Sequence, residues 1–373
     1  MKKFNLESQA GLAISKIKDT IPKIMELDSM LTKISKTSRL AEKELKQLGT
    51  ESYLAARRYG KDASDYLSSL QRMSQSGFHG EAGMGMAEQS LLAQSAGGME
   101  QEIADKYILA ANAAYKFNGE ASKINEVLDG QNNISSRNKI ALKEIASAMV
   151  EAGAAASNYN VTIEELSAMI ATMESITRSG GSEVGNSIKT LLTNLQNAGS
   201  DKITDTLDKA NASMTEMASG AEQLRNPISI LRDLAKTFSQ LNENDPLKAE
   251  ILANIGGQEH AAQLSALLQN MNMFDKMLVD YSEGTGSAFE AANKSANNLS
   301  GTLNKLSNSW TELVGSMVNS DEFKTGANLL DSMIQGATKL VSVLTPLGTI
   351  GVGAGLFASL KNTGKCRMSI RIS

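Results

Sequence analysis

Histidine and cysteine, the side chains that most often bind zinc or act as nucleophiles, are scarce in this chain. The 373 residues include two histidines, His79 and His260, and one cysteine, Cys366. These residues are far apart in sequence and lack the spacing of a zinc site. One cysteine also excludes a disulfide within the chain. We therefore expect no metal and no other cofactor, and we interpret His260 as an ordinary helix residue.

Three glycine-containing stretches come close to catalytic or phosphate-binding motifs without completing them. Ser182 and Gly185 resemble part of a nucleophile elbow, but the strand expected before the serine is missing. Gly60–Lys61 lacks the upstream glycine of a phosphate loop, and Gly351–Gly353 lacks the third glycine of a dinucleotide fold. Adjacent acidic residues could act as a catalytic pair, but helix capping and the helix dipole explain them here. The sequence therefore predicts a protein that is not an enzyme.

The composition indicates an all-α protein. Aromatic residues make up 4% of the chain and prolines number four, whereas methionines number 18. Such a chain forms helices readily, and methionine fills irregular gaps between them. The net charge is −4 with both signs interspersed, so we expect no sequence-specific nucleic acid binding. We predict an elongated multi-helix bundle of helical hairpins followed by a long coiled-coil-like helix, with no real sheet.

The spacing of apolar residues and of glycines predicts where several helices lie. One helix is expected to carry Pro22 in its first turn, and another to run from Met99 to Val127. Residues 77–98 are interpreted as a flexible connection around a short helix, and residues 128–138 as a loop. A capping residue before proline predicts two further helix starts, at Asn226–Pro227 and Asp245–Pro246.

The stretch from Asn160 to Leu195 predicts two amphipathic helices joined by a glycine break. Thr162 and Glu165 have the spacing of a capping box at the start of the first helix. Gly180–Gly181 is expected to end that helix and to set the angle between the two helices. Ser182 is expected to cap the second helix.

This order of parts resembles the core motif of phage tail tape-measure proteins. In that family the second helix usually opens with a Gly-Ser-Glu-Ala-Gly-Thr run. Here Gly185 matches the second glycine of the run, whereas Val184 replaces the usual alanine and Asn186 the usual threonine. The similarity extends from about Lys61 to Met317.

The resemblance implies a structural role in a phage or prophage. In the family, several copies occupy the lumen of the virion tail, helical length sets tube length, and the protein then leaves ahead of the DNA and helps it cross the host membrane. The implied partners are further copies, the tail tube and the tail assembly chaperone proteins. At a rise of about 1.5 Å per residue, a fully helical chain would span on the order of 560 Å. Because family members are commonly longer, we expect a truncated form.

A heptad pattern of apolar residues from Phe289 to Met317 predicts a packing seam. The pattern holds over about four heptads, and the flanking positions are small and uncharged. We interpret it either as a seam between copies or as one long helix packed within its own domain. The centre of the seam is formed by Leu299, Leu303, Leu306, Trp310, Leu313 and Met317.

An uncharged segment near the C-terminus, Leu340 to Leu360, has the length of a membrane span. Gly351 and Gly355 have the spacing of a close-packing motif of membrane helices, whereas Pro346 interrupts the segment. A buried helical hairpin is the alternative interpretation. Two other functional classes therefore remain open: a membrane-active helical pore-former and a cytoplasmic coiled-coil scaffold.

We divide the chain into five regions along its length. They are N-terminal helices (1–77), a helical core (78–245), a helical region with the seam (246–320), C-terminal helices with the apolar segment (321–360), and a basic irregular tail (361–373).

Overall fold

A computed structural model describes residues 6–38, 42–197, 199–218 and 221–318 of the chain. It confirms the all-α, elongated architecture. In chain order the elements are α1 (Leu6–Ser38), α2 (Glu42–Tyr59), α3 (Ala63–Gln75), α4 (Gly80–Gly97), α5 (Gln101–Tyr115), α6 (Ala121–Asn138), α7 (Leu142–Asn158), α8 (Ile163–Thr177), α9 (Gly181–Leu195), α10 (Asp201–Lys209), β1 (Thr215–Ala218), β2 (Ala221–Leu224), α11 (Pro227–Gln240), α12 (Pro246–Ile251), α13 (Ala261–Gln269), α14 (Met271–Ser282), α15 (Ser287–Ala296) and α16 (Leu299–Val318).

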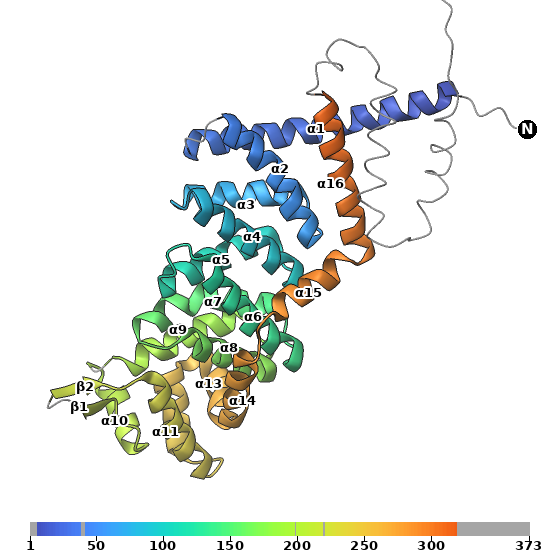
Figure 1. Cartoon of the computed structure of the whole chain (residues 1–373). Coiled ribbons are helices and arrows are strands. Elements are labelled where there is room, and N and C mark those ends of the chain that lie inside the picture. Colours follow the sequence, from blue (N-terminus) through green and yellow to red (C-terminus); the bar gives the residue numbers. More distant parts are fainter. Residues whose placement is uncertain (1–5, 39–41, 198, 219–220, 319–373) are drawn as a thin grey trace, which may run out of the picture.

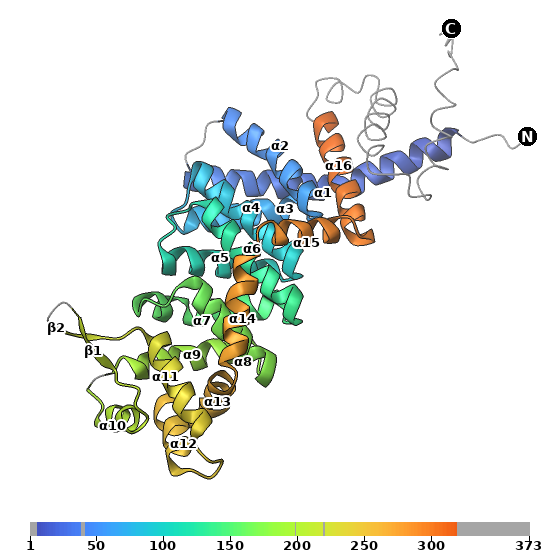
Figure 2. The same ribbon diagram turned by 60° about the horizontal axis from the view of Figure 1, so that its bottom comes forward.

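The helices form a stack along which the chain first descends and then returns. Figure 1 shows the descent from α1 to α11, followed by α14, α15 and α16, which run back along one side of the stack to α1. The turned view gives the same arrangement (Figure 2). On the return, α15 packs against α4 and α6, and α16 packs against α1 and α2. The last described helix thus lies beside the first, although some 300 residues separate them in sequence.

A continuous apolar core runs through the stack. It is built from leucine, isoleucine, methionine and alanine side chains that repeat every three or four residues along each helix. The largest of its fully buried side chains are Tyr107 and Phe274. Small alanines alternate with these large residues, which lets neighbouring helices approach closely.

The two helix starts predicted before proline are confirmed. The Asn226 side chain accepts a hydrogen bond from the backbone N–H of Ile228 at 2.8 Å, with Pro227 in the first turn. The Asp245 side chain accepts from the N–H of Leu247 at 2.9 Å, with Pro246 next to it. Both helices begin where a capping oxygen satisfies a free amide and where proline has no amide to lose.

The prediction that Pro22 opens a helix is wrong. Pro22 lies inside the 33-residue helix α1, which begins at Leu6 and ends at Ser38. A proline inside a helix removes one backbone hydrogen bond and disfavours the helix locally. Here α1 continues through that site and packs against α2, α3 and α16, so tertiary contacts outweigh the local preference.

The helix predicted from Met99 to Val127 is two helices, α5 and α6. The break lies at Lys116, Asn118 and Gly119, which all have positive φ, and the Asn112 side chain accepts from the N–H of Gly119 at 2.7 Å. An Asn-Gly pair is a strong turn signal, and it outweighs the apolar periodicity that continues across it. The predicted loop at 128–138 is instead the second half of α6.

The region interpreted as a flexible connection, 77–98, contains the 18-residue helix α4. Met86, Leu91 and Leu92 of this helix are buried. A Cβ placed on Gly85 would lie 2.9 Å from the Cβ of Ala121, so the glycine allows α6 to start close to α4. The glycines here therefore serve close helix packing and do not interrupt the helix.

A small sheet occurs where none was predicted. Strands β1 and β2 pair antiparallel, with Thr215 opposite Leu224 and Ala218 opposite Ala221. The hairpin projects from the lower end of the stack (Figure 1). Its described residues are mostly exposed, so it adds little to the core.

The continuous seam helix predicted from Phe289 to Met317 is also divided. It forms α15 and α16, which are separated at Asn297–Asn298. The Asn298 side chain accepts from the N–H of Gly301 at 2.8 Å, and its backbone oxygen accepts from Thr302. Asparagine is favoured at helix starts for this reason, and the heptad pattern alone did not reveal the change of direction.

Candidate functional site

The predicted capping box at the start of α8 is present. The Thr162 side chain accepts from the N–H of Glu165 at 3.2 Å, and the Glu165 carboxylate accepts from the N–H of Thr162 at 2.9 Å. This reciprocal pair satisfies two of the amides that a helix start leaves free. It fixes the beginning of α8, whose Leu166, Ile170 and Met173 are fully buried.

The turn between α8 and α9 differs in detail from the prediction. Helix α8 ends at Thr177, and its C-cap Arg178 is in the left-handed conformation, before the two glycines. Gly180 has a φ of 90° and is the N-cap of α9, so Ser182 lies inside the helix and does not cap it. The Glu144 carboxylate of α7 accepts from the N–H of Gly181 at 2.7 Å and so takes over the capping role.

Gly181 and Gly185 are where α9 touches the backbone of α7. A Cβ on Gly181 would lie 2.1 Å from the carbonyl oxygen of Glu144. A Cβ on Gly185 would lie 2.7 Å from the carbonyl oxygen of Ala148 and 2.8 Å from the Cβ of Glu151. No larger residue fits at either position without moving α9 away from α7. The two glycines one turn apart therefore set this helix contact by their lack of side chains.

The polar half of α6 is the docking site for the returning chain. The Asp129 carboxylate accepts from the N–H of Gly286 at 2.8 Å and from the N–H of Ala288 at 2.9 Å, so it caps the start of α15 from another helix. Asn132 donates to the hydroxyl of Ser287 at 2.5 Å. The segment predicted as a loop is helical because its polar side chains find these partners across the interface.

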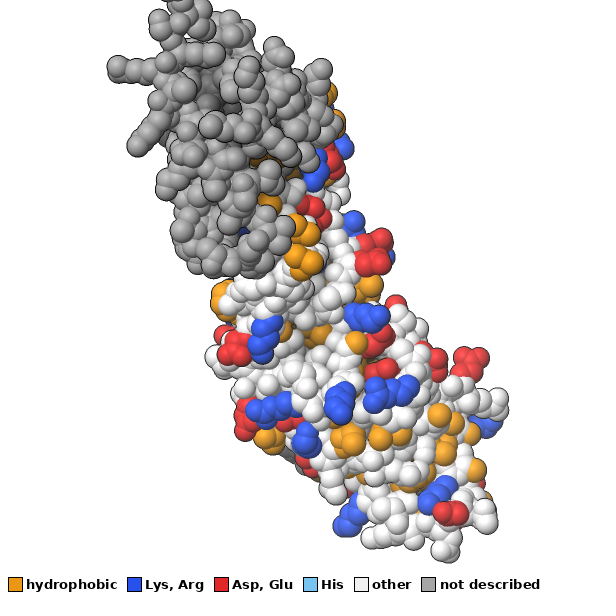
Figure 3. Space-filling view, turned by 90° about the vertical axis from the view of Figure 1, so that its right-hand side faces the viewer, with side chains coloured by type: hydrophobic (Ala, Val, Ile, Leu, Met, Phe, Trp, Pro, Cys, Tyr) orange, Lys and Arg blue, Asp and Glu red, His pale blue; other side chains and the backbone are white. Residues whose placement is uncertain are grey.

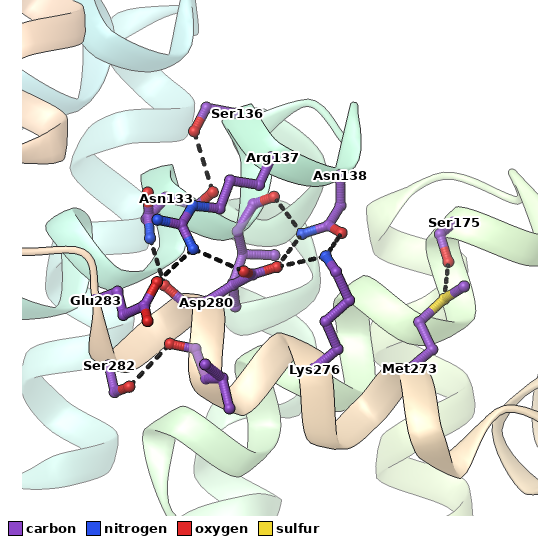
Figure 4. Close-up of polar contacts among 12 residues, drawn as sticks. Asn133, Ser136, Arg137, Asn138, Ser175, Met273, Lys276, Asp280, Ser282 and Glu283 are labelled. Atoms are coloured by element: carbon purple, nitrogen blue, oxygen red, sulfur yellow. Dashed lines mark hydrogen bonds and ion pairs between the residues drawn. The ribbon is translucent and has the colours of Figure 1, made fainter.

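A second cluster joins α6 to α14 (Figure 4). The Asp280 carboxylate accepts from Arg137 at 3.1 Å, from Asn138 at 2.7 Å and from Lys276 at 2.8 Å. Arg137 also pairs with Glu283 at 2.5 Å. Burial alone would raise the pKa of Asp280, but the hydrogen bonds and the two cations outweigh it and hold the pKa below its ordinary value.

Glycine also shapes this second interface. A Cβ on Gly130 would lie 2.6 Å from the ring of Tyr281, so the ring lies flat against the α6 backbone. A Cβ on Gly284 would lie 2.5 Å from the carbonyl oxygen of Asp129. Polar side chains and two glycines thus together fix the point where the chain turns back toward its N-terminal helices.

The inner face of α16 is polar and contacts the turn between α2 and α3. Asn308 donates to the carbonyl oxygen of Lys61 at 2.6 Å and accepts from the N–H of Ala63 at 3.2 Å. Asn304 donates to the carbonyl oxygen of Gly60 at 2.9 Å. The same face carries an ion pair between Glu312 and Arg57. One helix face therefore satisfies the backbone of a distant turn.

The outer face of α16 is the predicted seam. Leu299 is 73% exposed and Leu303 is 54% exposed. The side chains of Leu306, Trp310 and Leu313 are half-buried, whereas the side chain of Met317 lies outside the described residues. The residues buried against the stack belong to the other side of the helix, for example Asn308 and Val314. The apolar stripe is therefore open at Leu299 and Leu303 and partly covered from Leu306 to Leu313.

Two apolar side chains outside α16 are also exposed. Phe289 at the start of α15 is 49% exposed, and Met25 of α1 is 67% exposed. Basic and acidic side chains are interspersed on the face in Figure 3, with no basic stripe on that face. Trp310, the single tryptophan of the chain, donates through its indole N–H to the hydroxyl of Thr20 at 3.0 Å.

Among residues 6–318, as far as they are described, neither a metal site nor a membrane span is present. No group of three or more His, Cys, Asp or Glu side chains there could hold a metal ion. No helix among those residues is both long and apolar enough to cross a bilayer. The segment from Leu340 to Leu360, with Pro346, Gly351 and Gly355, lies outside the described residues.

Sequence reasoning missed Asp129, Asp280 and Asn308, each of which makes at least two long-range hydrogen bonds to the other side of a helix contact. A signal for the first of these was present. Asp129, Asn132, Asn133, Ser136 and Arg137 recur at three- and four-residue spacing, which indicates one polar helix face as well as it indicates a loop.

Comparison with known proteins gives one family. A family model described as a phage-related minor tail protein matches residues 42–257, which is more than half of the chain. The match covers α2 to α12 and therefore includes the capping box and the Gly181–Gly185 contact. No solved structure matches the chain.

Proposed function

Because the chain belongs to the family of phage-related minor tail proteins, we propose that it acts as the tape measure of a phage tail. In this role it is a structural component that sets tube length during assembly. Its partners are the tail tube, the tail assembly chaperone proteins and further copies of itself, and its place is the lumen of the virion tail. The single observation that carries the proposal is the helix–glycine–helix motif at 162–195 within the matched family region.

The described fold constrains how such a chain would measure length. Twelve helices precede the point where the chain turns back at α13 and α14, and none is longer than 33 residues. A helix stack that doubles back spans far less than a single helix of the same length, at about 1.5 Å per residue. A tape that uses the full helical length therefore requires the return segment to leave the stack.

The open stripe on α16 is the surface that we propose for contacts between copies. Leu299 and Leu303 are exposed in the single chain, and the heptad spacing continues through Leu306 and Leu313. Apolar residues at every third and fourth position bury themselves by packing against a like stripe. The neighbouring positions carry serine, threonine and asparagine, so ion pairs would not fix the orientation of the partner.

Tail length in intact phage tests the tape-measure proposal. We expect that deleting one whole heptad within residues 299–313 of the gene product shortens the tail by about 10 Å, and that deleting two shortens it by about 20 Å. Electron microscopy of the tails measures the effect. Tails of unchanged length would contradict the proposal.

A four-residue deletion in the same region is the matched control. Removing seven residues keeps the apolar stripe in register, whereas removing four rotates it by more than 30°. The four-residue deletion should therefore reduce the yield of tails more than the lost length explains. Equal yields of tails for both deletions would contradict a role of the stripe in contacts between copies.

Help with DNA passage across the host membrane is a second candidate role. Its support is the uncharged sequence from Leu340 to Leu360. A synthetic peptide of this segment should insert as a helix into lipid vesicles and release a trapped dye. A peptide that stays in the aqueous phase would remove this role.

A further inference from the structure

Helices α15 and α16 form a strap that differs from the rest of the stack in how it is held. We define the strap as residues 287–318. It lies along one side of the stack, reaches from α6 to α1 and contacts helices that precede it by more than 150 residues (Figures 1 and 2). The strap is therefore held in place mainly by contacts with helices distant in sequence, and contacts with helices adjacent in sequence contribute little.

The apolar contact of the strap is thin. In α15 the buried apolar side chains are the three alanines Ala288, Ala292 and Ala296, and in α16 the fully buried one is Val314. By contrast α14, the helix just before the strap, buries Phe274 and Met277 completely. Apolar burial scales with the area removed from water, so the strap gains much less from burial than α14 does.

Polar groups also take part in holding the strap, and one of them is costly to bury. Lys305 is 9% exposed and donates to the amide oxygen of Asn297 at 2.8 Å, and burial lowers the pKa of its ammonium group. The strap also borders a partly open surface pocket of about 190 Å³ lined by α1, α2, α3 and α16, with Tyr53 and Ser307 in its lining.

The start of the strap has the features of a hinge. Gly284 and Gly286 lie between α14 and α15, and Gly286 has a φ of 78°. The Asp129 carboxylate holds the first turn of α15 through two backbone amides. If these two hydrogen bonds and the contacts beyond them break, the backbone at Gly286 can change direction, because glycine adopts φ values that other residues avoid.

We propose that the strap detaches as one unit from the N-terminal helices while α4 to α14 stay folded. Local opening of this kind begins in the parts of a protein with few buried apolar contacts, and the strap fits that description. Detachment exposes the polar inner face and frees the apolar outer stripe along its whole length. Such an opening is one of the steps that a fully extended tape would need, but the proposal concerns the isolated chain and does not depend on the tape-measure role.

Trp310 reports on the strap directly, because it is the single tryptophan and lies on α16. We expect its fluorescence maximum to shift to the red at a lower urea concentration than the one that causes the main loss of far-UV circular dichroism. In Asn308→Ala, which loses both contacts with the α2–α3 turn, the fluorescence midpoint should fall by about 0.5–1 M urea while the circular dichroism midpoint stays in place.

Asn194→Ala is the matched control. Asn194 is also a helix side-chain amide that donates to a backbone carbonyl, that of Ile255 at 3.0 Å, but it lies within the stack. It should lower the circular dichroism midpoint and leave the fluorescence midpoint unchanged. Hydrogen exchange of the wild type gives a second measurement, in which amides of α16 should exchange faster than those of α8 and α9.

Two results would overturn the proposal. One is a wild type in which fluorescence and circular dichroism change at the same urea concentration. The other is an Asn308→Ala variant in which both midpoints fall together. Either result would mean that α15 and α16 unfold with the stack and form an integral part of it. Tail length plays no part in this test, so its failure would leave the tape-measure proposal standing.

Discussion

The contact between α7 and α9 and the contact of α6 with α14 and α15 both join helices in the stack, but by different means. Between α7 and α9, Gly181 and Gly185 let two backbones touch, and apart from the hydrogen bond between Gly181 and Glu144 the contact is made by buried apolar side chains. Between α6 and the returning helices, Asp129 and Asp280 accept several hydrogen bonds from backbone amides and from cations. The first contact depends on shape and tolerates no added atoms. The second depends on charge and responds to pH.

The largest expected effect concerns shape. Gly185→Ala adds a methyl group 2.7 Å from the carbonyl oxygen of Ala148, so α9 must move, and we expect the free energy of unfolding to fall by about 3 kcal/mol. Gly315→Ala in α16 is the control, because its nearest neighbour, a methyl carbon of Ile24, lies 3.9 Å from the new Cβ. That change should be neutral or stabilise by up to about 1 kcal/mol, since alanine favours a helix. Urea unfolding measures both, and equal stabilities would contradict the importance of the close contact.

An intermediate effect is expected at the charged contact. Asp280→Asn leaves Arg137 and Lys276 without their shared carboxylate, and we expect a loss of about 2 kcal/mol at neutral pH. Because the pKa of Asp280 is lowered in the fold, its contribution is present above the ordinary carboxyl pKa and is lost as pH falls through the folded value.

The difference in stability between wild type and Asp280→Asn should therefore shrink as the pH falls below about 4. Urea titrations at a series of pH values measure this difference. A difference that stays constant down to acidic pH would show that Asp280 contributes through packing and not through its charge.

The buried carboxylate of Asp105 in α5 has a pKa shift opposite to that of Asp280. Burial raises the pKa of Asp105, although hydrogen bonds from serine side chains and the charge of Arg72 act in the other direction. A raised pKa means that the ionised group costs stability, so its contribution changes with pH in the opposite sense to that of Asp280. Burial raises the pKa of both carboxylates, and the hydrogen bonds and neighbouring cations outweigh it only at Asp280.

The smallest expected effect is at the start of α8. Thr162→Ala removes the hydroxyl that accepts from the N–H of Glu165, and we expect a loss of about 1 kcal/mol. Thr162→Ser keeps the hydroxyl and should retain most of the stability. Both variants should unfold with unchanged cooperativity in urea. A loss as large as that of Gly185→Ala would mean that the turn, and not the glycine contact, holds the motif together.

Local signals in the sequence were reliable where one residue acts on its own neighbours. The capping box at Thr162 and the asparagine and aspartate caps before Pro227 and Pro246 could be predicted because each needs only a few consecutive residues. The same reasoning failed at Pro22 and at residues 128–138, where distant helices supply the deciding contacts. A polar stretch forms a loop when water supplies its hydrogen-bond partners. It forms one face of a helix when another helix supplies them.

What the sequence determined by itself is the helical character of the chain and the helix starts at Thr162, Asn226 and Asp245. These follow from the spacing of apolar residues and from short-range capping, which are properties of adjacent residues. The tertiary structure decided which faces meet. It turned the heptad stripe of α16 outward and its Asn308 face inward, because that face satisfies backbone groups at Lys61 and Ala63 that no residue nearby in sequence can reach. It also decided that Gly181 and Gly185 are contact points, since a glycine in a sequence does not reveal which backbone will lie against it.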